Sequence, residues 1–181
     1  LKSIKRTGFG TALFADWRYN DDGSDKPDFI LNHPKTNGAS ILVGRNNFGC
    51  GSSREHAVWA VAQQGFKVVI APLEGDIPGF ADIFCNNCVK NGVLTIQLSA
   101  EEVDQIFEMT TSDEPLEATV DLEQQRVVFK QPGDDVEFTF VTEPSVKEKL
   151  LLGLDDIAES LMYESDISRF ETQHNAQLLN T

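Results

Sequence analysis

The pattern of apolar and polar positions predicts alternating strands and helices in the first two thirds of the chain. Short apolar runs, rich in β-branched residues, predict buried strands at residues 40–44, 67–71 and 93–98. Helix-forming stretches follow the first two runs at residues 57–64 and 79–87. Ser99, followed by two glutamates, predicts the start of another helix that ends near Met109. Strand–helix alternation of this kind is typical of an α/β fold.

The rest of the chain follows a different pattern. Alternating apolar residues predict a meander of strands at residues 120–122, 127–129 and 136–141. A helical region is expected from Pro144 to Phe170, with a polar, frayed tail from about residue 172. Near the other end, residues 9–18 place Trp17 and other apolar side chains at helical spacing and predict a short amphipathic helix. With 181 residues, we expect a single domain over residues 1–181.

The stretch Gly49-Cys50-Gly51-Ser52-Ser53-Arg54-Glu55-His56 connects the first predicted strand to the first helix. Glycines let a backbone approach a ligand closely, and a helix N-terminus attracts an anion. The spacing Ser52-x-x-Glu55 is equally that of a capping box, which would make Ser52 an ordinary helix cap. A cap does not require Arg54, whose guanidinium suits a carboxylate better than the first turn of a helix. Both interpretations, a helix cap and an anion-binding turn, remain open on the residues alone.

This stretch carries a family resemblance. Asn47-Phe48-Gly49-Cys50-Gly51-Ser52-Ser53-Arg54-Glu55-His56-Ala57 is similar to the signature loop of the mobile domain in the aconitase superfamily. With Phe80-Ala81-Asp82-Ile83-Phe84-Cys85-Asn86-Asn87-Cys88, it resembles the small subunits of bacterial 3-isopropylmalate dehydratases. The resemblance implies an α/β fold of the swivelling β/β/α type, with a mixed, partly barrel-like sheet and flanking helices.

The resemblance also implies a function. It describes the small subunit of a cytoplasmic hydro-lyase that interconverts 2-isopropylmalate and 3-isopropylmalate in leucine biosynthesis and is active only with its large subunit. Ser52 would be the catalytic base, and Gly51, Ser53 and Arg54 would bind a carboxylate of the small hydroxy-diacid substrate. The large subunit would carry the [4Fe–4S] cluster, so we expect no metal or cofactor on this chain.

Two departures from the family pattern stand out. The family's small subunits begin earlier, with an Asp-Thr-Asp-Gln segment near the site, and we expect that segment to be missing here. The connection at residues 72–79 is longer than the family pattern and is expected to change the rim of the site. A related dehydratase acting on homoaconitate or a methyl-substituted malate therefore stays an alternative.

The cysteines offer an alternative from another class. Cys85 and Cys88 have the spacing of a metal or redox pair, and Cys50 raises the count to three. The pair falls among apolar residues of a predicted helix, where small buried thiols are ordinary packing residues. A Cys-based metal or redox protein is therefore the less favoured hypothesis. A further alternative is a non-catalytic binding module in which Ser52 is only a helix cap.

Composition excludes other classes of partner. The chain has 29 acidic and 15 basic side chains, a formal net charge of −14. Such a charge argues against binding to a phosphate backbone. Its apolar runs are far shorter than a membrane span. An odd number of cysteines is best explained by reduced thiols in a cytosolic protein.

Overall fold

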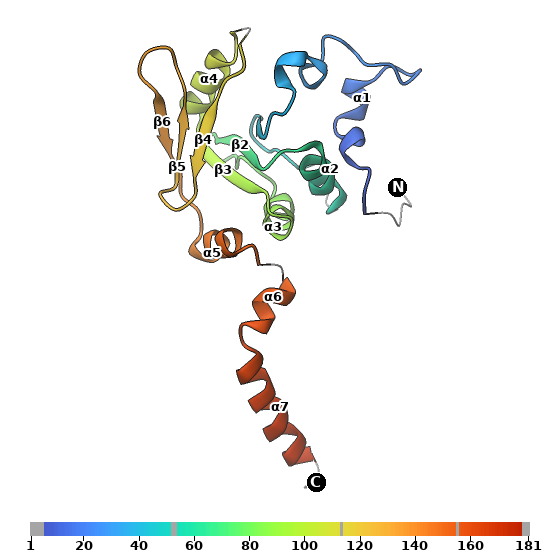
Figure 1. Ribbon diagram of the computed structural model, residues 1–181, viewed down its shortest axis with the longest axis vertical. Coiled ribbons are helices and arrows are strands. Elements are labelled where there is room, and N and C mark those ends of the chain that lie inside the picture. The colour runs from blue at the N-terminus through green and yellow to red at the C-terminus, as the bar shows by residue number, and fades with distance from the viewer. Residues whose placement is uncertain (1–5, 52–53, 113, 155, 179–181) are drawn as a thin grey trace.

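The computed structural model describes residues 6–51, 54–112, 114–154 and 156–178. A three-stranded parallel sheet lies at the centre of the body, in the order β1-β2-β3 (Figure 1). Its strands are β1 (Ile41–Val43), β2 (Val68–Leu73) and β3 (Leu94–Ser99). The crossover helices are α2 (His56–Gln64) and α3 (Asp82–Lys90), and α4 (Ala100–Met109) follows β3. The predicted strand–helix alternation is confirmed.

A second, antiparallel sheet is the predicted meander. It consists of β4 (Ala118–Asp121), β5 (Arg126–Phe129) and β6 (Val136–Thr139), paired in that order. The two sheets stay separate and neither closes, so the partly barrel-like shape that we expected does not form in the described residues. The reason is that β1 is an edge strand, which pairs only with β2 in this part of the chain.

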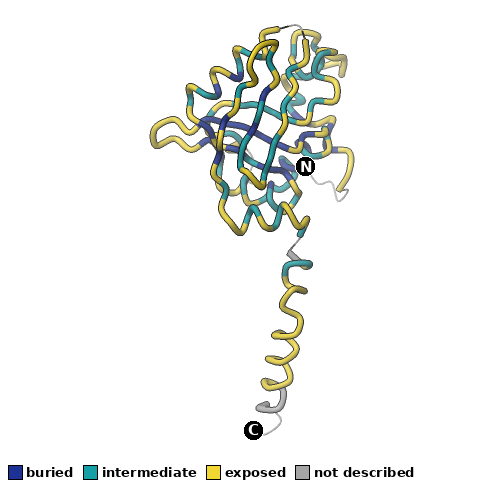
Figure 2. The backbone as a smooth tube through the Cα atoms, turned by 60° about the vertical axis from the view of Figure 1, so that its left-hand side comes forward, coloured by how far each residue is buried: buried dark blue, intermediate teal, exposed yellow. Residues whose placement is uncertain are grey.

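Strand β2 divides the core into two layers because its side chains alternate between the two faces of the sheet. Val69 and Ala71 pack with α2 and α3 on one face. Val68 and Ile70 pack with α4 and the inner face of the antiparallel sheet on the other. Figure 2 shows these central strands as the buried part of the molecule. Pro72 is tolerated at the end of β2 because β1 has already ended at Val43.

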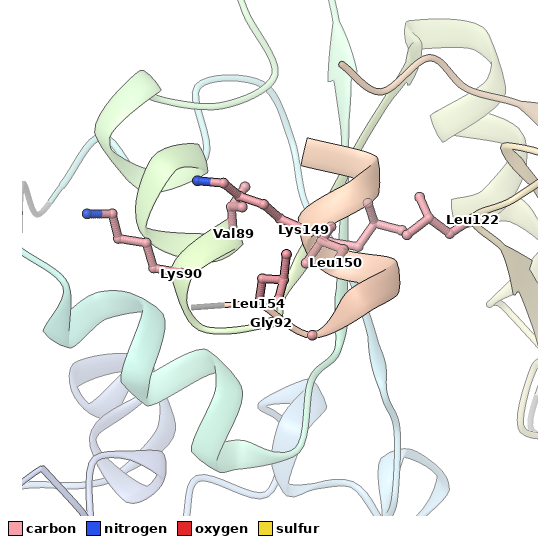
Figure 3. Close-up of a pocket in the computed structure, with 9 residues that line it drawn as sticks. Val89, Lys90, Gly92, Leu122, Lys149, Leu150 and Leu154 are labelled. Atoms are coloured by element: carbon pink, nitrogen blue, oxygen red, sulfur yellow. The ribbon is translucent and has the colours of Figure 1, made fainter. Parts of the chain in front are cut away.

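The chain ends in three helices, of which only the first packs against the body. Helix α5 (Pro144–Leu152) lies against α3, and Val89, Leu150 and Leu154 border a small hollow of about 280 Å³ between them (Figure 3). Gly153 ends α5 with φ of 64°. Helices α6 (Asp156–Leu161) and α7 (Glu164–Leu178) then point away from the body (Figure 1). Helix α7 continues through the expected start of the polar tail at residue 172 to Leu178.

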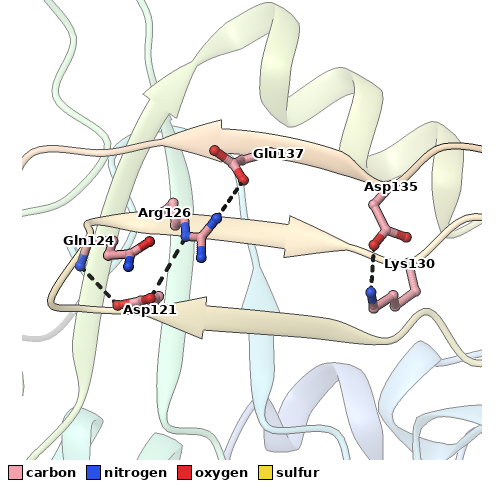
Figure 4. A network of polar contacts seen from close by, with 6 residues as sticks. All are labelled: Asp121, Gln124, Arg126, Lys130, Asp135 and Glu137. Atoms are coloured by element: carbon pink, nitrogen blue, oxygen red, sulfur yellow. Dashed lines mark hydrogen bonds and ion pairs between the residues drawn. The ribbon is translucent and has the colours of Figure 1, made fainter.

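The outer face of the antiparallel sheet is polar (Figure 4). Arg126 pairs with Glu137 at 3.1 Å and approaches Asp121 at 3.8 Å across neighbouring strands. Lys130 pairs with Asp135 near the β5–β6 turn. Such exposed pairs contribute little stability, but they keep this face solvated.

The predicted helix over residues 9–18 is interrupted. A 3-10 turn at Gly10–Ala12 is followed by a single α-helical turn, α1 (Ala15–Arg18), and Phe14 between them has φ of 54°. Trp17 is 67% exposed and stacks on Phe14, although its spacing indicated a core residue. None of the helices in the described ranges combines the length and apolar character that a membrane crossing requires.

Candidate active site

The glycine-rich turn lies at the carboxyl edge of the parallel sheet, just after β1. The connection between β2 and α3 meets it there, because parallel strands end at the same edge. Their backbones pair directly: the Phe48 amide donates to the Gly79 carbonyl at 2.8 Å, and the Ala81 amide donates to the Phe48 carbonyl at 3.0 Å. This pairing also explains why α3 begins at Asp82 and not at residue 79 as predicted.

The connection at residues 72–79 supports the turn. Glu74 and Ile77 pair as a tight hairpin, with Gly75 at φ of 59° between them. The Glu74 carboxylate accepts a hydrogen bond of 2.8 Å from the Asn46 side-chain amide. From behind, the Gln97 side chain of β3 accepts a bond of 2.9 Å from the Gly79 amide. This connection thus holds the first half of the turn.

Gly49 requires its residue type for two reasons. Its φ of 84° is in the left-handed region that favours glycine. A Cβ at this position would lie 2.3 Å from the Phe84 ring, so the turn backbone rests on α3. Phe48 packs edge to face on the same ring, with centroids 5.3 Å apart. The turn is therefore fixed from below while its outer side stays open.

Helix α2 begins at His56, and its N-cap residue is Glu55, which makes no side-chain capping bond. The capping box would have required Ser52 at the N-cap position and Glu55 inside the first helical turn. Ser52 lies outside the described residues, so that interpretation stays a prediction; the structure shows only that Glu55 stands at the N-cap position. The Glu55 carboxylate instead accepts a hydrogen bond of 2.9 Å from the side chain of Asn91, at the end of α3. This bond between side chains 36 positions apart joins the start of α2 to the end of α3.

His56 packs and does not point into an open site. Its ring lies 4.7 Å from Trp59 and 5.1 Å from Phe9, measured between centroids. Its Nδ1 atom is buried and has no hydrogen-bond partner among the described residues. An imidazole in that aromatic setting is poorly placed to exchange protons with a ligand at the turn.

The residues predicted to form the site fall into two groups. Gly51 and Arg54 are both exposed, in the same turn, directly before α2. Ser52 and Ser53 lie outside the described residues, so their catalytic and binding roles stay predictions.

The cysteines do not form a metal or cluster site. Cys88 is fully buried, and burial raises the pKa of its thiol far above the usual range. Burial also raises the pKa of Cys85, against a hydrogen bond from Thr95 that lowers it. Since the thiolate is the form that binds metal, neither group is prepared for that role. Cys50 is exposed on the turn, and the described ranges hold no group of three or more His, Cys, Asp or Glu that fits a metal.

Several residues that shape the site escaped the sequence prediction. Asn46, Asn91 and Gln97 each support it through a side-chain hydrogen bond to a distant segment. Their partners cannot be read from local patterns. Asn47 carried a usable signal, since asparagine is enriched at positive φ and its φ here is 57°.

The fold and this exposed turn define a domain of the aconitase type, and the aconitase C-terminal domain family matches residues 1–101. Three relatives named 3-isopropylmalate dehydratase small subunit are similar in sequence to this chain over nearly its whole length. The protein from Desulforapulum autotrophicum is 53% identical over 96% of this chain and 82% of its own length. Those from Rhodopirellula baltica and Rubrobacter xylanophilus are 51% and 52% identical over 94% of this chain, and over 83% and 80% of their own lengths. The chain therefore belongs to the 3-isopropylmalate dehydratase small-subunit family.

A solved structure agrees with this assignment. The crystal structure of 3-isopropylmalate dehydratase from Methanocaldococcus jannaschii matches with a TM-score of 0.51 and 25% sequence identity. The match covers 71% of this chain and 67% of that chain. The swivel-type α/β fold expected from the sequence is confirmed, apart from the barrel-like closure.

Proposed function

We propose that this chain is the small subunit of a hydro-lyase that interconverts 2-isopropylmalate and 3-isopropylmalate, by dehydration and rehydration, in leucine biosynthesis. The observation that carries the proposal is the 53% identity over 96% of the chain to a protein of that name. The open turn at the carboxyl edge of the parallel sheet supports it, because ligands of open α/β sheets bind at that edge.

Ser52 is the proposed base that removes a proton from carbon. A serine hydroxyl is a weak base at neutral pH, so its alkoxide form needs a positive local field. The N-terminus of α2 would provide such a field. The Glu55 carboxylate does not cap it, because that carboxylate accepts a hydrogen bond from Asn91. Arg54, in the same turn, adds a positive charge.

Gly51, Ser53 and Arg54 are the proposed carboxylate-binding residues. A guanidinium presents two parallel N–H donors that match the two oxygens of a carboxylate. Gly51 leaves open space where a side chain would stand, with nothing within 4 Å of a Cβ built there. A diacid substrate could therefore approach the turn backbone directly while Arg54 fixes one of its carboxylates.

The cofactor belongs to the partner in this proposal. The thiols of this chain do not fit a cluster, because burial raises the pKa of fully buried Cys88 and of half-buried Cys85, while Cys50 lies on the turn. We assign the [4Fe–4S] cluster to the large subunit, where it would act as a Lewis acid on the departing hydroxyl. The family name implies that large subunit as a partner, and we place the pair in the cytoplasm.

Reconstitution tests the proposal. This chain is mixed with a cluster-loaded large subunit, and the isomerisation of 3-isopropylmalate is followed beside homoaconitate and methyl-substituted malates. Turnover of isopropylmalate by the pair, and by neither chain alone, is expected. An assembled pair that prefers another hydroxy diacid would reassign the substrate, and turnover by the isolated small chain would refute the two-chain mechanism.

A further inference from the structure

Helices α6 and α7 form a projecting C-terminal arm, defined here as residues 156–178. In both Figure 1 and Figure 2 the arm extends from the body as a single file of helix, and every residue of it from 160 to 174 is exposed. The fifteen residues of α7 would span about 22 Å at 1.5 Å per residue. Helices of this length are marginal in water unless a packed face stabilises them.

The arm presents the apolar face that such packing requires. Ile157 and Leu161 are 70% and 59% exposed and are spaced one turn apart in α6. In α7, Ile167 and Phe170 are three positions apart, and Phe170 stacks on His174 with ring centroids 5.6 Å apart. Apolar side chains at this spacing form one stripe along a helix. Met162 and Tyr163, both more than half exposed, continue it between the two helices.

The base of the arm is joined to the helix that supports the candidate site. The Lys149 ammonium of α5 pairs with the Glu159 carboxylate of α6 at 2.7 Å. Helix α5 packs on α3 around the hollow of Figure 3. Helix α3 in turn supports Gly49 through Phe84, and Asn91 at its end holds Glu55. A partner that covers the turn therefore lies on the same packed helices, α3 and α5, from which the arm projects.

Charge identifies the kind of surface that fits the arm. Residues 155–181 contain six of the chain's 29 acidic side chains and one arginine, Arg169. The remainder of the chain is also net acidic. Docking onto the body or onto a second copy would bring like charges together, which disfavours both. A surface with an apolar groove and a basic rim would complement the stripe and its flanking carboxylates.

We infer that the arm binds the large subunit, in an apolar groove rimmed by lysine or arginine, and so fastens the two chains beside the candidate site. The inference rests on the proposed function for the existence of that partner. The arm would form a second contact with the large subunit, separate from the glycine-rich turn.

The test compares two double variants of the full chain. In I167D/F170D both substitutions fall on the stripe, while in S165D/T172D the same two charges fall about 140–160° around the helix from Ile167, at 100° per residue. All four side chains are exposed, so both proteins should keep the circular dichroism and melting point of the wild type. The dissociation constant for the large subunit is measured by titration calorimetry.

We expect I167D/F170D to weaken binding by about 10²-fold or more, because two buried apolar side chains are lost from the interface. S165D/T172D should bind within about threefold of the wild type. At saturating large subunit, I167D/F170D should recover wild-type turnover, since the arm does not contact the substrate. Equal affinity of the two variants, or a wild-type chain that fails to bind the large subunit, would overturn the inference.

Two further readings define the partner surface. E164Q/D166N/E171Q should weaken binding severalfold at low salt and less at high salt; tighter binding would overturn the basic rim. Self-association of the isolated chain that I167D/F170D abolishes, with large-subunit affinity unchanged, would assign the arm to a second copy instead. A pair that assembles without turning over isopropylmalate would refute the proposed function, while the two affinities would still decide the role of the arm.

Discussion

The spacing Ser-x-x-Glu precedes both α2 and α4, with different results. At α4 the capping box is complete: the Ser99 hydroxyl accepts from the Glu102 amide at 3.2 Å, and the Glu102 carboxylate accepts from the Ser99 amide at 2.7 Å. At α2 the helix begins only at His56, and the carboxylate of Glu55 is bound by Asn91.

The path of the preceding chain explains the difference. Ser99 is the last residue of β3 and enters α4 directly, with extended backbone angles suited to an N-cap. The chain before α2 instead crosses a turn pinned by the β2–α3 connection and by Phe84. Consequently the protein closes the positive end of α4 with its own capping box, whereas among the described residues at α2 the Glu55 carboxylate is bound by Asn91 and does not cap the helix.

The largest expected effect separates the two serines. Ser52→Ala should reduce the turnover of the reconstituted pair by roughly 10²–10⁴, the usual contribution of a positioned base. Its melting point should change little, because the N-cap of α2 is Glu55. Turnover and a melting curve are measured on the same assembled protein. A folded, assembled Ser52→Ala variant with near wild-type turnover would remove Ser52 from the mechanism.

A second substitution tests the support beneath the turn. Gly49→Ala should lower the free energy of unfolding by about 2–4 kcal/mol, since it adds left-handed strain and a clash with Phe84. Gly133→Ala is the matched control, because Gly133 lies in a surface bend with open space around its Cα, and it should change stability by less than about 0.5 kcal/mol. Equal denaturation midpoints for the two variants would show that the turn does not rest on α3.

The charge of the turn can be kept while its geometry is changed. Arg54→Lys retains the positive charge but loses the paired N–H donors, so KM for the diacid should rise by about tenfold. Steady-state kinetics of the reconstituted pair provide the measurement. Unchanged KM and kcat would contradict the assignment of Arg54 to the substrate carboxylate.

The smallest of these effects completes the comparison. Ser99→Ala should lower the free energy of unfolding by about 1 kcal/mol, because it removes a complete helix cap. Turnover of the assembled pair should stay at the wild-type level. Chemical denaturation combined with the same kinetic assay distinguishes this pattern from that of Ser52→Ala. A Ser99→Ala protein that loses turnover without losing stability would reverse the roles given to the two serines.

Local sequence predicted the elements well wherever one short pattern determines the structure. The apolar run at residues 67–71 predicts β2, and Ser99 predicts the start of α4. The interruption at Phe14 was not predictable, because a bulky residue at positive φ is held there by its surroundings and not by its own preference.

The site divides in the same way. The motif alone indicated Gly51 and Arg54, and the structure leaves both exposed in one turn. Family resemblance, and not local physics, assigned the roles of Ser52 and Ser53. The bonds of Asn91 to Glu55 and of Asn46 to Glu74 join segments 36 and 28 positions apart. Only the folded chain brings such partners together, so no local pattern could have shown these two bonds.

The position of Cys50 has a practical consequence for chemical labelling. Its thiol is exposed two residues before Ser52, whereas Cys88 is fully buried with a raised pKa and Cys85 is half-buried. A brief treatment with iodoacetamide near neutral pH should therefore alkylate Cys50 first, as read by mass spectrometry of its peptide. Bound diacid or large subunit should slow that reaction, whereas labelling of Cys85 should not change. The rate of alkylation at one sulfur atom would then report occupancy of the turn without any substitution in the protein.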